Sequence, residues 1–285
     1  MLKLILNKKY NPLFESDCRY FIITGGRGSG KSFAVTVFLT LLTMTKGIRI
    51  LFTRYTMVSA HLSIIPEFLE KISLLGFETI FSINKSEVVN LGNQSDILFR
   101  GIKTSSGNQT ASLKSLQGIS TWCLDESEEL IDEDIFDTID LSIREKNIQN
   151  RIILILNPVT KEHWIYKRFF EDKGIEGGFN GVKDNVCYIH STYLDNIVNL
   201  STSFLERIKT IKHNNFKKYT HKILGGWLDK AEGVVFDNWS IGEFNPDGLQ
   251  TSCGMDFGFS VDPDSLTEVA IDKKHKKIYL KEHIY

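Results

Sequence analysis

The chain has 285 residues and carries 34 Lys and Arg against 35 Asp and Glu, which leaves a formal net charge of -1. This length suits one large domain, or one domain with part of a second, with a full hydrophobic core in either case. The balanced charge excludes a bulk basic field, so any contact with nucleic acid has to come from a local patch.

The four cysteines are scattered without the spacing of a metal or redox motif, which is typical of a reducing cytoplasm. The longest apolar runs are far below membrane-spanning length, and the N-terminal segment lacks the apolar core and cleavage site of a secretion signal. We therefore expect a soluble protein of the cytoplasm, without a membrane segment.

Short β-branched runs alternate with amphipathic stretches along most of the chain. The pattern predicts strands at 20–23, 48–52, 121–124, 151–156 and 186–190, with a hairpin-like pair at 79–90. It predicts helices from residue 31, at 58–75, at 131–143 and at 162–170. This βαβ order favours a mostly parallel sheet with helices on both faces, in one α/β domain over 1–225.

A change of pattern follows that domain. Residues 226–250 are rich in Gly, contain Pro246 and lack helical periodicity, so we interpret them as a linker. Closely spaced strands are expected next at 252–256, 266–271 and 277–285. Because three strands without a covering helix cannot bury a core of their own, residues 251–285 look like an incomplete domain.

The loop Gly25-x-x-x-x-Gly30-Lys31-Ser32 follows a strand and opens a helix, which is the context of a Walker A phosphate loop. The glycines let backbone N–H groups curl around phosphates, Lys31 reaches the β and γ phosphates, and the Ser32 hydroxyl ligates Mg²⁺. The predicted nucleotide-binding residues are Gly25, Gly26, Arg27, Gly28, Ser29, Gly30, Lys31 and Ser32.

Two acids follow the strand at 121–124. Asp125 stands at its carboxyl end, where it would hold Mg²⁺ through water, and Glu126 would orient and deprotonate the attacking water. We therefore assign Asp125 to a Walker B motif. Glu126, as the base, and Lys31 are predicted catalytic residues.

Three further features leave alternatives open. Arg27 is a candidate arginine finger in cis, or a structural residue of the loop. Asn157, at the end of the strand 151–156, can sense the γ phosphate or simply form an Asn-Pro turn. The basic stretch 203–230 can contact the DNA backbone or be a solvated helix face. The segment with Tyr10 and Phe14 is expected to cover the adenine.

Together these motifs resemble the large terminase subunit of tailed bacteriophages, the motor that packages DNA into the procapsid. The resemblance rests on "TGGRGSGKS", "TWCLDESEEL", "LILNPVTKEHWIYKRFF", "ILFRGIKTSSGNQTASLKSLQGIS", "HSTYLDN" and "GGWLDKAEGVVFDNW", which occur in the right order over nearly the whole chain. It implies a RecA-like P-loop NTPase fold that hydrolyses ATP with Mg²⁺, with Asn157 at the coupling position.

The resemblance also implies the partners and the location. These are double-stranded viral DNA, a small terminase subunit, the portal protein of the procapsid and further copies of the chain in a ring. The protein would work in the cytoplasm of the bacterial host and transiently at the portal.

In that family the linker leads into a ribonuclease H-like nuclease that uses two metal ions. The stretch "GMDFGFSVDPDSL" resembles its first motif, so Asp256 carries over as a metal ligand. The family's other carboxylates come from elements later than Tyr285, so we expect an incomplete nuclease here. A second divalent site, for Mg²⁺ or Mn²⁺, would need the completed domain.

Two other functions fit the P-loop. One is a helicase or another DNA-processing ATPase, which a preference for single strands would support. The other is an inactive prophage fragment that acts only in assembly, which an absence of ATP turnover would support.

Overall fold

The computed structural model describes residues 4–56, 60–84, 86–104, 107–108, 116–229, 240–246, 248–257 and 264–284. The chain divides into two compact units, Met1–Gly233 and Val234–Tyr285, which we describe separately. Within the described residues, no helix combines the length and the apolar character that a membrane crossing needs.

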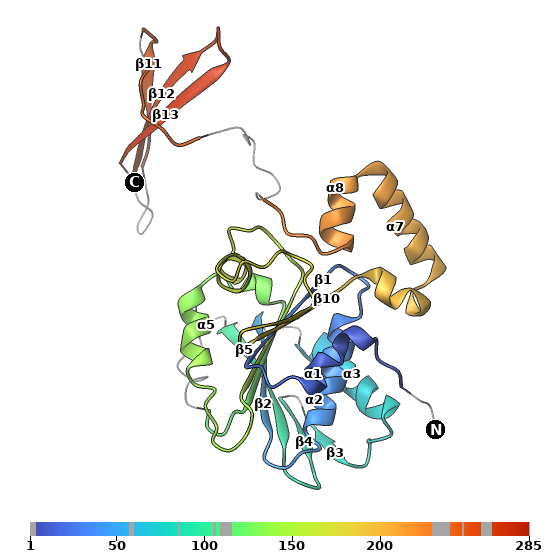
Figure 1. The fold of residues 1–285 in the computed structure, drawn as a ribbon. Helices are drawn as coiled ribbons and strands as arrows, with labels where there is room; N and C mark the ends of the chain where they lie inside the picture. Colours follow the sequence, from blue (N-terminus) through green and yellow to red (C-terminus); the bar gives the residue numbers. More distant parts are fainter. Residues whose placement is uncertain are drawn as a thin grey trace. The chain divides into compact units, whose positions relative to one another are not determined.

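The first unit is built on a ten-stranded sheet with the order β3-β4-β5-β2-β7-β8-β1-β10-β9, in which β6 pairs with β5 (Figure 1). The strands from β5 through β2, β7, β8 and β1 to β10 are parallel, whereas β3, β4, β6 and β9 run antiparallel to their neighbours. Their bounds are β1 Tyr20–Gly25, β2 Arg49–Thr56, β3 Phe81–Ile83, β4 Glu87–Asn90, β5 Asp96–Thr104, β6 Gly107–Asn108, β7 Thr121–Asp125, β8 Arg151–Leu156, β9 Gly181–Lys183 and β10 Val186–Ser191.

Helices cover both faces of the sheet (Figure 1). One face packs against α2 (Lys31–Leu42) and α3 (Ala60–Leu74), with the short α1 (Pro12–Glu15) beside them. The other face packs against α5 (Glu133–Asp140), α6 (Trp164–Tyr166) and the π-helix η3 (Lys167–Glu171). The remaining helices are η1 Lys8–Tyr10, η2 Ser127–Glu129, η4 Tyr193–Asn199, α7 Thr202–Asn214, α8 Phe216–Lys218 and η5 Tyr219–Ile223.

Alternation along β1 explains why both faces are covered. Phe21 and Ile23 join the core of α2 and α3, whereas Ile22 between them joins the core of α5 and η3. All three side chains are fully buried, as expected for a central strand of a parallel sheet. The predicted mostly parallel sheet with helices on both faces is therefore confirmed.

Two features of this unit differ from the sequence-based expectation. The strands β5, β6 and β9 were not predicted. The start of the predicted linker is packed, because the backbone N–H of Leu228 donates to the carbonyl oxygen of Val159 at 2.8 Å. The Trp227 ring lies 5.0 Å from the ring of Tyr166. The described residues 226–229 thus belong to the packed first unit.

The second unit contains an antiparallel sheet of three strands, β11 (Thr251–Asp256), β12 (Ser265–Asp272) and β13 (Lys277–Ile284), in that order. Its described residues include no helix. Residues 230–239, which lie in the predicted linker, fall outside the described residues. The ribonuclease H-like character of this unit stays a prediction.

Candidate functional site

The candidate site lies at the carboxyl edge of the parallel strands. Because β1, β2, β7 and β8 are parallel neighbours in the sheet, the residues at their carboxyl ends meet at one edge. A cavity of about 590 Å³ opens there. Its lining includes nearly all the predicted site residues, namely Gly26, Arg27, Gly28, Ser29, Gly30, Lys31, Ser32, Asp125, Glu126 and Asn157, together with Phe33, Arg54, Ile155, Leu156, Asn199, Leu200, Ser201 and Phe204.

The P-loop connects β1 to α2 and is held from behind by backbone. Gly28 and Gly30 both have φ of +81°, a left-handed conformation that favours glycine. A Cβ atom on Gly26 would lie only 1.9 Å from the carbonyl oxygen of Ile223 in η5. The backbone N–H of Arg27 donates to the carbonyl oxygen of Lys222 at 3.0 Å. Close packing against η5 therefore fixes the path of the loop.

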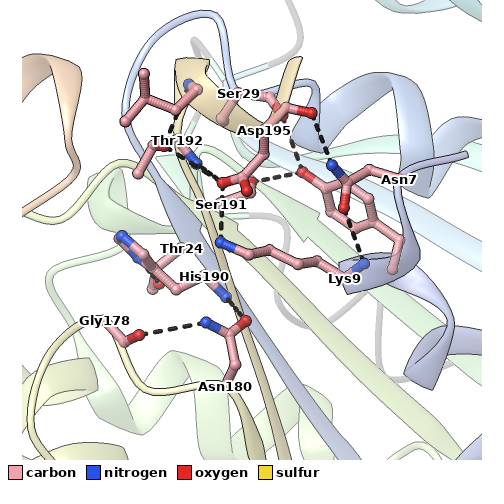
Figure 2. Close-up of polar contacts among 12 residues, drawn as sticks. Asn7, Lys9, Thr24, Ser29, Gly178, Asn180, His190, Ser191, Thr192 and Asp195 are labelled. Atoms are coloured by element: carbon pink, nitrogen blue, oxygen red, sulfur yellow. Dashed lines mark hydrogen bonds and ion pairs between the residues drawn. The ribbon is translucent and has the colours of Figure 1, made fainter. Parts of the chain in front are cut away.

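The N-terminal segment braces the same loop from the side of β10. Lys9 forms an ion pair with Asp195 at 2.9 Å, and Asn7 donates to the backbone oxygen of Asp195 at 2.7 Å; Figure 2 shows both contacts. The Tyr10 hydroxyl donates to the backbone oxygen of Ser29 at 3.2 Å. Tyr10 is buried, does not line the cavity, and supports the phosphate loop through its hydroxyl. Phe14 packs on Phe38 and does not line the cavity either, and the covering of an adenine by this segment stays a prediction.

Lys31 is the buried cation of the site. Its Nζ atom donates to the carbonyl oxygens of Gly25 at 2.7 Å and of Gly26 at 3.3 Å. It also donates to Oδ1 of Asn157 at 3.0 Å. Burial lowers the pKa of Lys31 to about 8, against the opposing effect of nearby carboxylates. An incoming phosphate would therefore meet a poorly solvated ammonium group, whose attraction for anions is strong.

Asp125 is the last residue of β7 and Glu126 follows it, and an arginine from β2 lies close to both carboxylates. Arg54 donates to Oδ2 of Asp125 through both Nε, at 2.8 Å, and a terminal nitrogen, at 2.6 Å. Its Nε atom lies 3.7 Å from Oε2 of Glu126. Burial raises the pKa of Glu126, and Arg54 opposes that rise. Glu126 has φ of +52°, which turns the chain sharply after the strand.

Asn157 lies between the P-loop and the segment after β7. While its Oδ1 atom accepts from Lys31, its side-chain nitrogen donates to Oε1 of Glu128 at 3.1 Å, and its backbone N–H donates to the same oxygen at 3.2 Å. The other oxygen of Glu128, Oε2, is buried and has no hydrogen-bond partner among the described residues. Burial raises the pKa of this carboxyl.

The segment after β10 forms the outer wall of the cavity. The side-chain nitrogen of Asn196 donates to the backbone oxygen of Gly28 at 3.0 Å. The ring of Phe204 lies so close that a Cβ on Gly28 would come within 2.8 Å of it. The helix α7, which Ser201 caps, thus begins at the cavity.

The remaining predicted residues are placed as follows. Ser32 and Arg27 are exposed at the rim of the cavity. Asp256 ends β11 in the second unit and is exposed. Within the described part of the chain, no group of three His, Cys, Asp or Glu side chains could hold a metal ion. A metal at the cavity would therefore need the phosphates of a bound nucleotide as additional ligands.

The oxygen donors at the cavity fit that requirement. Mg²⁺ takes oxygen ligands, and in nucleotide sites it keeps waters and uses one or two protein groups plus phosphates. Ser32 is exposed and lines the cavity, and Arg54 donates to Oδ2 of Asp125 through two nitrogen atoms, so Oδ1 could face a metal-bound water. The site fits Mg²⁺ bound together with a nucleotide.

Sequence reasoning missed Arg54, Glu128, Asn196 and Phe204. Arg54 and Glu128 each lie within a few residues of a predicted strand end. This closeness is the signal that could have made them candidate site residues. Asn196 and Phe204 come from a segment about 170 residues after the P-loop, and only the fold brings them to it.

A strand, a glycine-rich loop with a buried lysine, and acids at the end of a second parallel strand of the same sheet define the class of P-loop α/β proteins. The profile of the family described as "Phage terminase large subunit" matches residues 17–226. The chain belongs to this family.

Two curated relatives extend the likeness beyond that region. The chain is 27% identical to the large terminase subunit of Bacillus phage SPP1, over 98% of this chain and 68% of the relative. It is 25% identical to the PBSX phage terminase large subunit of Bacillus subtilis (strain 168), over 96% of this chain and 67% of the relative. The chain thus spans about two thirds of the length of each.

Among solved structures, the large terminase of a thermophilic bacteriophage has the same fold. In one crystal form it gives a TM-score of 0.63 at 16% identity, over 99% of this chain and 69% of that one. Complexes of the same phage protein with ADP and with ATP-γ-S give TM-scores of 0.61 and 0.59, at 15% identity and with 98% of this chain covered. They cover 69% and 68% of the phage protein's chain, respectively.

Proposed function

We propose that the chain is the ATP-hydrolysing subunit of a phage DNA-packaging motor, which moves double-stranded DNA into a procapsid. The observation that carries the proposal is the meeting of a buried P-loop lysine, two acids at the end of β7 and an asparagine after β8 at one cavity. Membership of the terminase family supports it, as do the ADP and ATP-γ-S complexes of the large terminase from the thermophilic bacteriophage.

The nucleotide would bind with its phosphates in the P-loop. Backbone N–H groups of the loop and the amino end of α2 offer a concave anion site. Lys31 would exchange its contacts with the loop carbonyls for the β and γ phosphates. Ser32 and Asp125 would hold Mg²⁺, which supplies charge neutralisation on the phosphate oxygens when bound.

Glu126 would act as the general base toward the attacking water. It lines the cavity beside Asp125, and burial shifts its pKa upward, toward the operating pH of an effective base. Arg54 opposes that shift and holds the carboxylate near its own guanidinium. The exposed Arg27 at the rim is a candidate for stabilising charge on the γ phosphate.

The basic residues of α7, α8 and η5 would contact the DNA backbone. Their side chains are exposed, and the first turn of α7 lines the nucleotide cavity. Such contacts would depend on salt and carry no sequence information. The positive residues are Arg207, Lys209 and Lys212 in α7, Lys217 and Lys218 in α8, and Lys222 in η5.

The remaining assignments rest on the family. We propose a ring of copies on a portal protein, with a small terminase subunit as DNA-recognising partner, working in the cytoplasm of the bacterial host. We propose residues 1–225, extended by the packed residues 226–229, as the ATPase domain, the rest of the predicted linker 226–250 as the connection, and 251–285 as the start of a ribonuclease H-like nuclease. There, Asp256 would be one metal ligand, and cleavage would need further carboxylates.

The test is steady-state ATP hydrolysis by the 285-residue chain, alone and with double-stranded or single-stranded DNA. We expect turnover that rises with the duplex, more than with the single strand, and that declines with added salt. A preference for single strands would favour a helicase. Absence of turnover at concentrations that allow a ring to assemble would contradict the proposed function.

A further inference from the structure

The side-chain amide of Asn157 lies between Lys31 and Glu128, and its orientation bears on how the site detects a nucleotide. An amide group has one acceptor end and one donor end. In this structure both are engaged, the oxygen by Lys31 at 3.0 Å and the nitrogen by Glu128 at 3.1 Å. The reverse orientation would set the NH₂ group against the ammonium of Lys31 and the amide oxygen against the carboxylate of Glu128. The two charged neighbours therefore fix the amide in one orientation.

Several hydrogen bonds hold Glu128 in place beside Asn157. Its Oε1 atom accepts from both the backbone and the side-chain nitrogen of Asn157, so the carboxylate is tied to the residue at two points. Its backbone oxygen is 3.2 Å from Nε2 of His163. Because Nδ1 of His163 accepts from the backbone N–H of Ile165, Nε2 carries the proton and donates to Glu128. The backbone of Glu128 is thus anchored to His163, the residue that caps α6.

We propose that Glu128 is a positioning residue that holds the amide of Asn157 with its oxygen toward Lys31, so that Asn157 responds to the nucleotide through Lys31 and not by donating to a phosphate. This inference rests on the proposed function. The residues concerned are Glu128 and Asn157, which contact the P-loop lysine through the amide oxygen of Asn157. When phosphates draw Lys31 away from that oxygen, Asn157 loses this hydrogen bond and remains held by Glu128.

The contact pattern suggests a donor–acceptor exchange as the test. Asn157→Asp alone sets a second carboxylate against Glu128, so the pair repels. In the double variant Glu128→Gln with Asn157→Asp, the glutamine amide donates to the new carboxylate, whose other oxygen still accepts from Lys31. Glu128→Met removes the acceptor at similar length, and Glu129→Met changes the exposed neighbouring acid as the matched control.

The measured quantities are kcat and KM for ATP and the melting midpoint of each variant. We expect Glu128→Met and Asn157→Asp to lower kcat about tenfold or more, because a small displacement of a phosphate-binding group is enough for such a loss. The double variant should recover most of that loss, and Glu129→Met should match the wild type. A merely structural role would lower the melting midpoint without this selective rescue of kcat.

A double variant no better than Asn157→Asp would overturn the inference, as would a wild-type kcat in Glu128→Met. If the wild-type chain does not hydrolyse ATP, that result counts against the proposed function, and the melting midpoints still test the contact of Glu128 with Asn157. In that case a midpoint restored by the double variant would support the fixed orientation of the Asn157 amide, and a midpoint that is not restored would refute this orientation.

Discussion

At the scale of single residues, the pair of Arg54 and Asp125 matters for stability as well as for the site. Both side chains are mostly buried, with relative exposures of 19% and 7%. We expect Arg54→Met to lower the free energy of unfolding by about 2 to 4 kcal/mol, because it leaves a buried carboxylate without its cation. Urea titration followed by circular dichroism would measure the change.

The pair of Arg49 and Asp96 provides the matched control on the same strand. The Arg49 side chain is 42% exposed and that of Asp96 is 12% exposed, so the cation of this pair is more solvated than Arg54. We expect Arg49→Met to cost less than Arg54→Met, about 1 kcal/mol, because water already screens the exposed guanidinium. Equal losses in the two variants would show that burial does not set the contribution of Arg54.

The sequence predicted many of the site residues but not their contacts. The glycine-lysine-serine spacing and the acids after a strand are local signals, so the residues of the P-loop, Asp125 and Glu126 could be named as candidates. The meeting of Arg54 with Asp125 and of Glu128 with Asn157 depends on the strand order β2-β7-β8-β1, which no local pattern encodes. Those partners therefore required the fold.

At the scale of elements, the packing of η5 behind the P-loop gives a sharp prediction. Gly225 has φ of +73°, and a Cβ there would lie 2.5 Å from the carbonyl carbon of Gly25. We expect Gly225→Ala to displace the loop and to weaken binding of a fluorescent ATP analogue about tenfold or more, since a displacement of about 1 Å is sufficient for such losses.

Gly174 separates this effect from simple backbone strain. It also has a positive φ, of +62°, but a Cβ there would meet nothing within 4 Å. Gly174→Ala should cost about 1 to 2 kcal/mol of stability for its left-handed conformation and leave nucleotide affinity unchanged. If both variants lost affinity equally, the bracing of the loop by Gly225 would be disproved.

The first turn of α6 predicts a pH effect on stability. His163 caps it through Nδ1, and burial lowers the pKa of this histidine below its ordinary 6.5. As the pH falls below about 6.5, the unfolded chain therefore binds a proton that the folded chain resists, and the free energy of unfolding falls.

The comparison that isolates this effect is His163→Asn, since asparagine also caps helices and does not titrate. We expect the melting midpoint of the wild type to fall more steeply than that of the variant below pH 6.5 and in parallel with it above. Parallel curves over the whole range would contradict the assignment.

Strand prediction succeeded where apolar runs are continuous and failed where they are interrupted. The strands β1 and β8 are almost entirely apolar and fully buried along most of their length. The missed strand β5 contains Arg100, Gly101 and Lys103, which weaken a strand signal. Its pairing with β2 along seven positions stabilises it regardless of that composition.

At the scale of the whole molecule, the division into two units predicts that the first folds and binds nucleotide alone. The residues that line and brace the cavity all lie within Met1–Gly233. We expect a chain ending at Gly233 to keep the affinity for an ATP analogue and a cooperative thermal transition. Loss of either would mean that the second unit contributes to the nucleotide site.

The central claim is that the P-loop cavity binds and hydrolyses ATP with Lys31 and Glu126 in different roles. The most direct test measures analogue binding and single-turnover phosphate release by the wild type, Lys31→Ala and Glu126→Gln. The account predicts that Lys31→Ala loses binding, while Glu126→Gln binds normally and releases phosphate more slowly by about a hundredfold or more. Phosphate release at the wild-type rate by Glu126→Gln, or undiminished binding by Lys31→Ala, would contradict it.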